Sequence, residues 1–339
     1  MIETVLGPIE PAALGPTSMH EHLLFDARAL RSPAREPLPA QRRVTIETLG
    51  FLRYNQLALD DNLHLDEPAL AAAELDDARA AGLSAVVDLT VWGFGGPAAA
   101  LPQVAREAGV HVIAGVGAYL GRTQPDWLRT LDADQLAALF VRALTERLPG
   151  CEHRAGIVGL VGAGIPPAPE EERAVRAAGA AAAQTGSAVV ARVDPRGRAA
   201  PRLLELLAHE GLPADRVVLS NVDGYATDHA YVAELAATGA TLKWCFGYEA
   251  PPRVGLTAAT DAQRIDAIAA LLERGHGRQV LACGAWTKTA LRRRGGPGLD
   301  HVLRRVVPAL RERGVSDDQL DRMLTGEPRR LLDRPGGAR

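Results

Sequence analysis

The chain has 339 residues, of which 47% are hydrophobic and 23% are charged, and its formal net charge is −3. This composition is typical of a globular protein with a large core, and the charge excludes a broad basic surface for nucleic acid or an anionic membrane. No apolar run approaches the roughly 20 residues that cross a bilayer, and no basic stretch leads into an apolar run near Met1, so we expect a cytoplasmic protein.

Cysteine and lysine are both scarce. The cysteines are Cys151, Cys245 and Cys283, and an odd, small number favours free thiols in a reducing compartment over a disulfide framework. The lysines are Lys243 and Lys288, against 36 arginines. Lysine at these two positions is therefore a departure from the general preference of this chain for arginine.

Short β-branched runs alternate with long stretches of Ala, Leu, Glu and Arg. This alternation is typical of βαβ units around a parallel sheet, and eight candidate strands predict one (β/α)8 TIM barrel, a single α/β domain over residues 1–339. The predicted strands are Thr17–Leu24, Ala85–Thr90, Val110–Gly117, Gly156–Val161, Ala188–Val193, Val217–Val222, Thr241–Phe246 and Gln279–Cys283.

Helical patterns fill the intervals and the tail, residues 301–333. Pro308 should kink the first tail helix, His301–Arg313, while Ser316 and Gln319 form a capping box that opens a second helix ending near Met323. The Pro- and Arg-rich residues 31–43 follow the first strand, so we expect a mobile loop over the barrel mouth. The other predicted helices are Glu67–Ala81, Pro169–Gln184, Pro201–His209 and Asp261–Glu273.

Active sites of such barrels lie at the carboxyl ends of the strands, so the polar residues there are the candidates for chemistry. In strand order they are His20, Glu21, His22, Asp88, Tyr119, Arg192, Asp194, Asn221, Asp223, Lys243, Cys245 and Cys283, followed by Trp286 and Lys288 in the loop after the last strand.

Several stretches in order along the chain carry a family resemblance. They include VLGPIEPAALGPTSMHEHLLFD from Val5, VVDLT from Val86, AREAGVHVIAGVGAYL from Ala105, RAGIVG from Arg154 and GLDHVLRRVVPALRERGVSDDQL from Gly298. The chain resembles the phosphotriesterase family, which includes lactonases and phosphotriesterase-related proteins. The resemblance implies a barrel whose mouth holds two divalent metal ions, usually zinc, and it implies a homodimer.

The resemblance places the family's first two metal ligands on His20 and His22, which lie two apart on a strand and so face the same side. At the other four ligand positions, on strands four, five, six and eight, it places Gly159, Arg192, Asn221 and Ala285. Two imidazoles fall short of the three protein ligands of a catalytic zinc, and a permanent cation at Arg192 repels a dication. We therefore predict no cofactor and no binuclear centre. The alternative is one zinc ion on His20 and His22, with Cys245 or Cys283 as a third ligand.

Each candidate has a functional and a structural interpretation. His20 and His22 are an acid/base pair or packing residues, since histidine titrates near neutral pH. Arg192 is a clamp for a substrate anion, or it forms an ion pair with a nearby aspartate that fills the vacated metal space. Strand alternation gives Lys243 and Cys245 one orientation, and the resemblance favours inward. The altered loop GFGGPA, residues 93–98, lacks the charged pair that the family usually has there.

These observations predict a metal-independent enzyme that moves protons on a small anionic or ester-type substrate, by elimination, cyclisation, isomerisation or hydrolysis, with a place in specialised metabolism. A mononuclear zinc hydrolase and a non-catalytic relative that binds a small molecule or a partner protein are the alternatives. The predicted catalytic residues are His20, His22, Arg192, Asp194 and Lys243. The predicted substrate-binding residues are Asp88, Tyr119, Asn221, Asp223, Cys245, Trp286 and Lys288.

Overall fold

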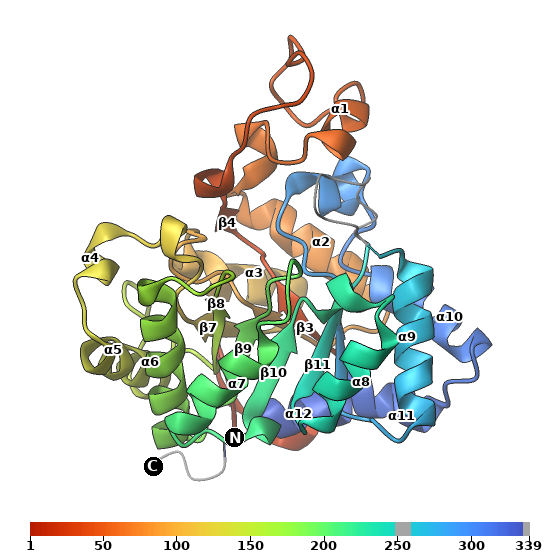
Figure 1. The fold of residues 1–339 in the computed structure, drawn as a ribbon. Coiled ribbons are helices and arrows are strands. Elements are labelled where there is room, and N and C mark those ends of the chain that lie inside the picture. Colours follow the sequence, from red (N-terminus) through yellow and green to blue (C-terminus); the bar gives the residue numbers. More distant parts are fainter. Residues whose placement is uncertain (248–258, 335–339) are drawn as a thin grey trace.

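Eight parallel strands form one sheet that curves into a barrel, and each predicted strand is found (Figure 1). The computed structural model describes residues 1–247 and 259–334. The strands are short and apolar because each is covered on both faces. They are β3 (Thr17–Glu21), β6 (Ala85–Asp88), β7 (His111–Val116), β8 (Ile157–Gly162), β9 (Val189–Arg192), β10 (Val217–Ser220), β11 (Thr241–Cys245) and β12 (Gln279–Ala282).

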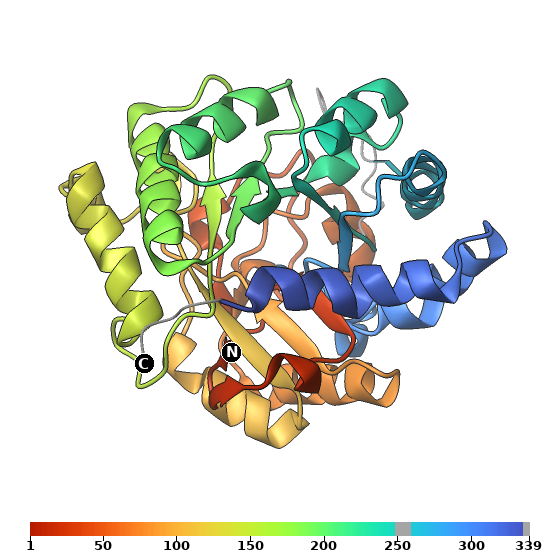
Figure 2. The ribbon, with the colours of Figure 1, turned by 90° about the horizontal axis from the view of Figure 1, so that it is seen from below.

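An outer layer of helices covers the barrel, as the view along its axis shows (Figure 2). The four helices predicted between strands are present, and none of their ends differs from the prediction by more than one residue. The helices of this layer are α2 (Pro68–Ala80), α3 (Leu101–Ala108), α5 (Ala133–Thr145), α6 (Pro169–Thr185), α7 (Ala200–His209), α8 (His229–Ala237) and α9 (Asp261–Glu273), with the short α4 (Asp126–Arg129) preceding α5.

A lobe of residues 27–63 projects from the carboxyl end of the barrel and carries the short helix α1 (Leu49–Tyr54) (Figure 1). Its base is held by the antiparallel pairing of β4 (Phe25–Asp26) with β5 (His64–Leu65). Residues 31–43 within this lobe form neither helix nor strand. That they form a mobile loop over the mouth stays a prediction. At the other end of the barrel lies the hairpin of β1 (Ile2–Thr4) and β2 (Gly7–Ile9).

The C-terminal helices contain two π-helical turns, each followed directly by a proline-containing helix. Val302–Val306 precedes α10 (Val307–Glu312), which contains Pro308. A proline ring clashes with the carbonyl four residues earlier, and a wider turn makes room for it, so the helix continues through the proline.

The same arrangement recurs at Pro328, and it corrects one predicted boundary. Ser316 caps α11 (Asp317–Asp321) through the predicted capping box with Gln319. The helix does not end near Met323, however, because it passes through the π turn Arg322–Gly326 into α12 (Glu327–Leu332). These last helices run across the amino end of the barrel (Figure 2).

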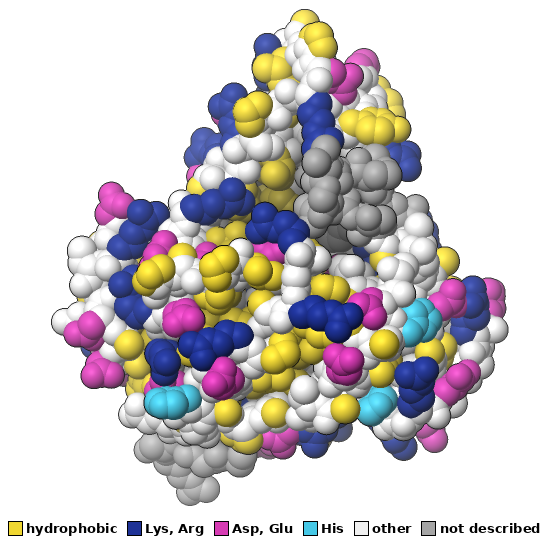
Figure 3. Space-filling view, in the orientation of Figure 1, with side chains coloured by type: hydrophobic (Ala, Val, Ile, Leu, Met, Phe, Trp, Pro, Cys, Tyr) yellow, Lys and Arg dark blue, Asp and Glu magenta, His cyan; other side chains and the backbone are white. Residues whose placement is uncertain are grey.

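The core has two layers, one inside the barrel and one between strands and helices. Val87, Ile113, Val190 and Val280 are fully buried in the inner layer. Trp244 faces the helices, where its indole N–H donates to the side chain of Gln279 at 2.9 Å. None of the described helices combines the length and apolar character needed to span a bilayer. Cationic and anionic side chains are interspersed on the visible face (Figure 3).

The barrel closes at a seam between β3 and β12, the two end strands of the sheet order. One carboxylate bridges this seam: Glu21 accepts hydrogen bonds from the backbone N–H groups of Cys283 at 2.9 Å and Ala285 at 3.0 Å. Burial raises the pKa of Glu21 to about 7, although hydrogen bonds from Ser18, Ala285 and Cys283 oppose the rise. The seam holds β3 in place, and the histidines of the site are on that strand.

Candidate active site

Two histidines and a lysine lie together inside the barrel at the carboxyl ends of β3 and β11. The Nε2 atoms of His20 and His22 are 2.9 Å apart. The Nζ atom of Lys243 is hydrogen-bonded to Nδ1 of His20 and donates to Sγ of Cys245 at 3.1 Å. Nδ1 of His22 lies 3.1 Å from Oγ1 of Thr90. Lys243 and Cys245 thus face inward, the orientation that the family resemblance favoured.

Burial and charge keep these groups in defined protonation states. Burial, Lys243 and the neighbouring His22 hold the pKa of His20 well below its ordinary value. Burial and the charge of Lys243 lower the pKa of His22 to about 3, so both imidazoles are neutral near pH 7 and can accept a proton. Burial raises the pKa of Cys245 to about 11, so its thiol keeps its proton.

Asp88 supports the loop that follows β6. Its carboxylate accepts hydrogen bonds from the backbone N–H groups of Leu23 at 2.7 Å and Thr90 at 2.9 Å, and only 2% of the residue is exposed. Burial raises the pKa of Asp88 to about 6, and these two bonds together with one from the Thr90 side chain oppose the rise. In this structure Asp88 therefore contacts protein groups, and its predicted contact with substrate stays a prediction.

A second polar group, at the carboxyl end of β9, contains Arg192 and Asp194. Asp194 is 1% exposed and is bound in a two-pronged arrangement by Arg196, at 2.9 Å from Nε and 2.6 Å from a terminal nitrogen. Although burial alone would raise it, these hydrogen bonds lower the pKa of Asp194 to about 2. Arg192 is 3.7 Å from Asp194 and 3.5 Å from the carbonyl oxygen of Ala163. Arg196 is thus a closer ion-pair partner of Asp194 than Arg192 is.

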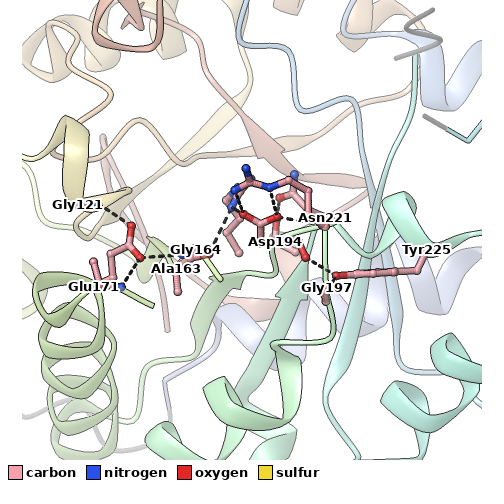
Figure 4. Close-up of polar contacts among 12 residues, drawn as sticks. Gly121, Ala163, Gly164, Glu171, Asp194, Gly197, Asn221 and Tyr225 are labelled. Carbon is pink, nitrogen blue, oxygen red and sulfur yellow. Dashed lines mark hydrogen bonds and ion pairs between the residues drawn. The ribbon is translucent and has the colours of Figure 1, made fainter. Parts of the chain in front are cut away.

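The surroundings of Asp194 are shown in Figure 4, with Asn221 beside it and Tyr225 beyond. The Tyr225 hydroxyl donates to the carbonyl oxygens of Asp194 and Gly197, which holds the loop after β9. Asn221 has a left-handed backbone with a φ of 67°, and its side-chain oxygen accepts from the Ser220 hydroxyl at 2.8 Å. The predicted residues Asp194 and Asn221 therefore lie side by side just beyond the carboxyl ends of the neighbouring strands β9 and β10 (Figure 4).

Glu171 connects the loops at the other end of Figure 4. One of its oxygens accepts from the backbone N–H of Gly121 at 2.9 Å, and the other accepts from Gly164 at 2.8 Å and Ala168 at 3.0 Å. The loops after β7 and β8 are therefore tied to the first turn of α6 by one buried carboxylate.

Aromatic rings form one wall of the site. His22 stacks on Phe94 with ring centroids 4.3 Å apart and an interplanar angle of 10°. Tyr119 and Trp286 meet the same Phe94 ring edge-on at 5.3 Å and 5.9 Å. The guanidinium of Arg192 lies 6.0 Å from the centre of the Tyr119 ring. The predicted residues Tyr119 and Trp286 thus contact Phe94, which in turn stacks on His22 of the histidine cluster.

The side chains of Lys288, Asp223 and Cys283 each have a partner within the protein. The ammonium of Lys288 is bound to Asp61 in the lobe at 2.9 Å, so it anchors the lobe to the loop after β12. Asp223 accepts a hydrogen bond from the backbone N–H of Cys245 at 3.4 Å. The thiol of Cys283 donates to the carbonyl oxygen of Leu299 at 3.6 Å and packs among the helix-facing core residues. Substrate contacts of Lys288 and Asp223 stay predictions.

Among the described residues, no three His, Cys, Asp or Glu side chains converge as a metal-ligand set. At Gly159 there is no room for a longer side chain, because an added Cβ would lie 2.7 Å from Cβ of Val190 on the next strand. Ala285 contributes only its backbone, which accepts from the N–H of His22 at 3.2 Å and donates to Glu21.

Sequence reasoning missed Thr90, Phe94 and Arg196 as members of the site. Thr90 is the last residue of the predicted second strand, in VVDLT, and Phe94 lies in the altered loop GFGGPA that follows it. The available signal was therefore their position at or just after the end of a barrel strand. Arg196 lies two residues beyond Asp194, a spacing that nothing in the local pattern distinguishes from that of an exposed arginine.

Comparison with known proteins shows the family of this chain. The Phosphotriesterase family matches residues 1–332. The N-acetyltaurine hydrolase of Salmo salar is 30% identical over 98% of this chain and 97% of its own, and a phosphotriesterase-related protein of Nematostella vectensis is 31% identical over 98% of both. A resiniferatoxin-binding protein from Rhodobacter sphaeroides, known as a crystal structure, superposes with a TM-score of 0.94 at 33% identity, covering 98% of this chain and 94% of that one. The chain therefore belongs to the phosphotriesterase family.

Proposed function

We propose that this chain is a hydrolase for a small amide or ester that carries an anionic group, and that it works without the family's binuclear metal centre. The observation that carries the proposal is the pairing of a neutral His20–His22 couple, linked to a buried lysine, with an arginine at the carboxyl end of β9. The relatives with hydrolase names support the reaction class, and N-acetyltaurine, the substrate named for several of them, is an amide with a sulfonate.

Arg192 suits the role of anion clamp. Its side chain is only 14% exposed, and its contacts with Asp194 and Ala163 are long, because Arg196 takes the short hydrogen bonds of Asp194. A guanidinium held in this way retains donors for a sulfonate, carboxylate or phosphate, which it binds in a two-pronged geometry.

The donor set supports catalysis without two metals. The Nε2 atoms of His20 and His22 are 2.9 Å apart, a hydrogen-bonding distance, and Lys243 brings a cation to the other nitrogen of His20. Glycine, arginine, asparagine and alanine at the other ligand positions supply no replacement carboxylate or imidazole.

The cluster can perform hydrolysis by proton transfer alone. With substrate in the barrel mouth beside the Nε2 atoms of both histidines, His22 takes a proton from a water molecule as the oxygen of that water bonds to the carbonyl carbon. His20 gives its Nε2 proton to the leaving nitrogen or oxygen as the bond to carbon breaks, and Lys243 replaces that proton at Nδ1 of His20. The proton on His22 then returns through His20 to Lys243, which restores the starting state.

The test uses N-acetyltaurine and its uncharged analogue N-ethylacetamide with the purified protein. We expect the wild type to hydrolyse the sulfonate, and Arg192→Ala to lower kcat/KM for it by roughly 10- to 150-fold, which corresponds to the loss of a charged hydrogen bond of about 1.5–3 kcal/mol. The effect on the uncharged analogue should be small. Arg198→Ala is the matched control, because Arg198 is bound to Asp228 at 2.7 Å and its side chain is 57% exposed.

Elemental analysis of the active protein tests the proposal that it works without a binuclear metal centre. We expect full activity in protein that carries less than one equivalent of zinc or another divalent metal after dialysis against a chelator. If activity were lost on dialysis and returned only when two equivalents of metal were bound again, the proposal would be contradicted.

A binding function is favoured by one specific observation, the TM-score of 0.94 with a resiniferatoxin-binding protein. Under that alternative, N-acetyltaurine, small lactones and N-acyl amino acids bind measurably by calorimetry, none is turned over, and His22→Ala leaves the affinity unchanged.

A further inference from the structure

Ser220 lies inside the barrel, between the proposed anion clamp and the buried lysine. It pairs with Arg192 on β9 and with Lys243 on β11. Residues that pair across parallel strands point to the same face of the sheet, so Ser220 faces inward with Lys243. The core agrees, because Val218 belongs to the inner layer and Leu219 to the helix-facing layer, and alternation then places Ser220 inside.

The next residue, Asn221, departs from this alternation. Continued strand geometry would direct its side chain toward the helices. Its backbone is left-handed instead, with a φ of 67°, and its side-chain oxygen accepts from the inward Ser220 hydroxyl at 2.8 Å. The amide is therefore turned back over the barrel mouth. Asn221 is the one non-glycine residue with a positive φ in the described part of the chain, and residues held in such conformations cluster at functional sites.

The side chain of Asn221 does not cap the turn that it precedes. Asn221 occupies the N-cap position of the 3-10 turn Val222–Tyr225, where an asparagine commonly accepts from the backbone N–H groups that follow, but its side chain makes no such bond. Its oxygen is bound by Ser220, and its nitrogen Nδ2 has no acceptor among the residues that the structure describes. The residue is only partly buried, so two N–H donors are open to a ligand at the carboxyl end of β10.

Hydrolysis of an amide or ester needs such donors. As water adds to the carbonyl carbon, negative charge develops on the carbonyl oxygen, and donors aimed at that oxygen lower the barrier. In the proposed function the two histidines and Lys243 transfer protons and Arg192 holds the anionic group, so none of them stabilises this charge. Asp194 lies beside Asn221 (Figure 4), but its carboxylate accepts from Arg196 at 2.9 Å and 2.6 Å, and the Asn221 amide stays available.

We propose that Asn221 is a catalytic residue: its Nδ2 amide donates to the carbonyl oxygen of the substrate and stabilises the negative charge that develops there as water adds. Ser220 is the positioning residue, because its hydroxyl binds Oδ1 and so directs Nδ2 to the substrate. The scissile carbonyl then lies at the end of β10, between Arg192 on β9 and Lys243 on β11. This role rests on the proposed function and adds to it the group that binds the carbonyl.

The kinetic test uses Asn221→Gly with N-acetyltaurine. Glycine adopts a positive φ without strain, so this variant removes the amide and keeps the backbone. We expect kcat to fall by roughly 10²- to 10³-fold, the scale of a lost oxyanion donor, with KM within about threefold. Asn221→Asp still accepts from Ser220 but has no N–H donor, and it should be at least as inactive. Ser220→Ala should lower kcat by a smaller factor, because the amide is present but no longer oriented.

The direct test measures binding of a tetrahedral mimic by calorimetry. The probe is the analogue of N-acetyltaurine in which a methylphosphonyl group replaces the acetyl group, so that a phosphoryl oxygen takes the place of the developing oxyanion. The wild type should bind it about tenfold or more tightly than Asn221→Gly does. The control is Gln103→Ala, which removes an amide from the exposed face of α3, where Gln103 donates to Glu107 at 2.8 Å. It should match the wild type in kcat and in affinity for the mimic.

The outcomes separate the two proposals. If the wild type hydrolyses N-acetyltaurine and a folded Asn221→Gly protein keeps the wild-type kcat, the role of Asn221 is wrong and the proposed function stands. If the wild type turns over no substrate, the proposed function fails, and the mimic decides the assignment of Asn221. Binding that is about tenfold weaker in Asn221→Gly then supports Asn221 as the donor to a tetrahedral oxyanion. Equal binding by the two proteins, or binding by neither, overturns it.

Discussion

One buried side chain, His153, lacks polar partners among the described residues and should therefore lower the stability of the protein. The imidazole of His153 is 7% exposed, and neither ring nitrogen has a hydrogen-bond partner among the described residues. A buried polar group left unpaired costs about 1–3 kcal/mol, so this position is a candidate for stabilisation.

We therefore expect His153→Leu to raise the free energy of unfolding by about 1–2 kcal/mol near pH 7.5. Burial lowers the pKa of His153, so between the folded and unfolded pKa values only the unfolded state takes up a proton. The free energy of unfolding therefore decreases as the pH falls below about 6.5, because the unfolded state is stabilised by protonation of His153. Urea unfolding of both proteins at about pH 7.5 and pH 5.5 should show a smaller acid loss for the variant, and equal losses would contradict the argument.

Charged pairs act at the same scale. Asp194 has a pKa lowered to about 2 by its hydrogen bonds to Arg196, so its contribution to stability is present above pH 4 or so and is lost as the pH falls towards 2. Asp194→Asn should remove this part of the acid transition and destabilise the protein at neutral pH by about 2 kcal/mol, since the buried carboxylate is lost as the acceptor of the charged hydrogen bonds from Arg196. Chemical denaturation between about pH 2.5 and pH 7 measures both effects, and an unchanged stability at neutral pH would count against the pair.

At the scale of elements, a few side chains decide how the strand-end loops are held. Glu171 at the start of α6 accepts hydrogen bonds from three backbone N–H groups in two loops, whereas Glu172 beside it forms a surface pair with Arg202. A carboxylate that accepts several hydrogen bonds stabilises more than an exposed ion pair.

Glu171→Gln should therefore destabilise the protein by about 2 kcal/mol, and Glu172→Gln by less than about 0.5 kcal/mol. The physical reason is that the amide has one acceptor atom in place of two. Thermal unfolding of the two variants under the same conditions is the measurement, and equal shifts in Tm would show that the loops do not depend on Glu171.

The whole molecule depends on closure of the barrel between its first and last strands. Glu21 supplies two acceptors across this seam, to Cys283 and Ala285. Glu21→Ala should lower the free energy of unfolding by about 3 kcal/mol, because it leaves two buried N–H groups unpaired. Amide hydrogen exchange should show the largest loss of protection in β3 and β12, and a loss spread evenly over all strands would contradict a seam held by this residue.

Much of the fold could be predicted from local pattern, and the site only in part. The eight strands were identified because a buried parallel strand is a short apolar run between helical stretches. The helix from Ser316 was predicted to end too early, since a π turn that accommodates Pro328 leaves no trace in the periodicity. His20, His22, Arg192 and Lys243 were located through strand ends and a family resemblance, and their catalytic roles stay predictions.

The sequence by itself determined the order of the eight strands, the helices predicted between them and the capping box at Ser316. Only the tertiary structure decided that Lys243 contacts His20, 223 positions away, and that Glu21 bridges to Cys283, 262 positions away. The physical reason is that alternation and helical period act over a few residues, whereas these contacts arise when the barrel closes and brings distant strand ends within hydrogen-bonding distance.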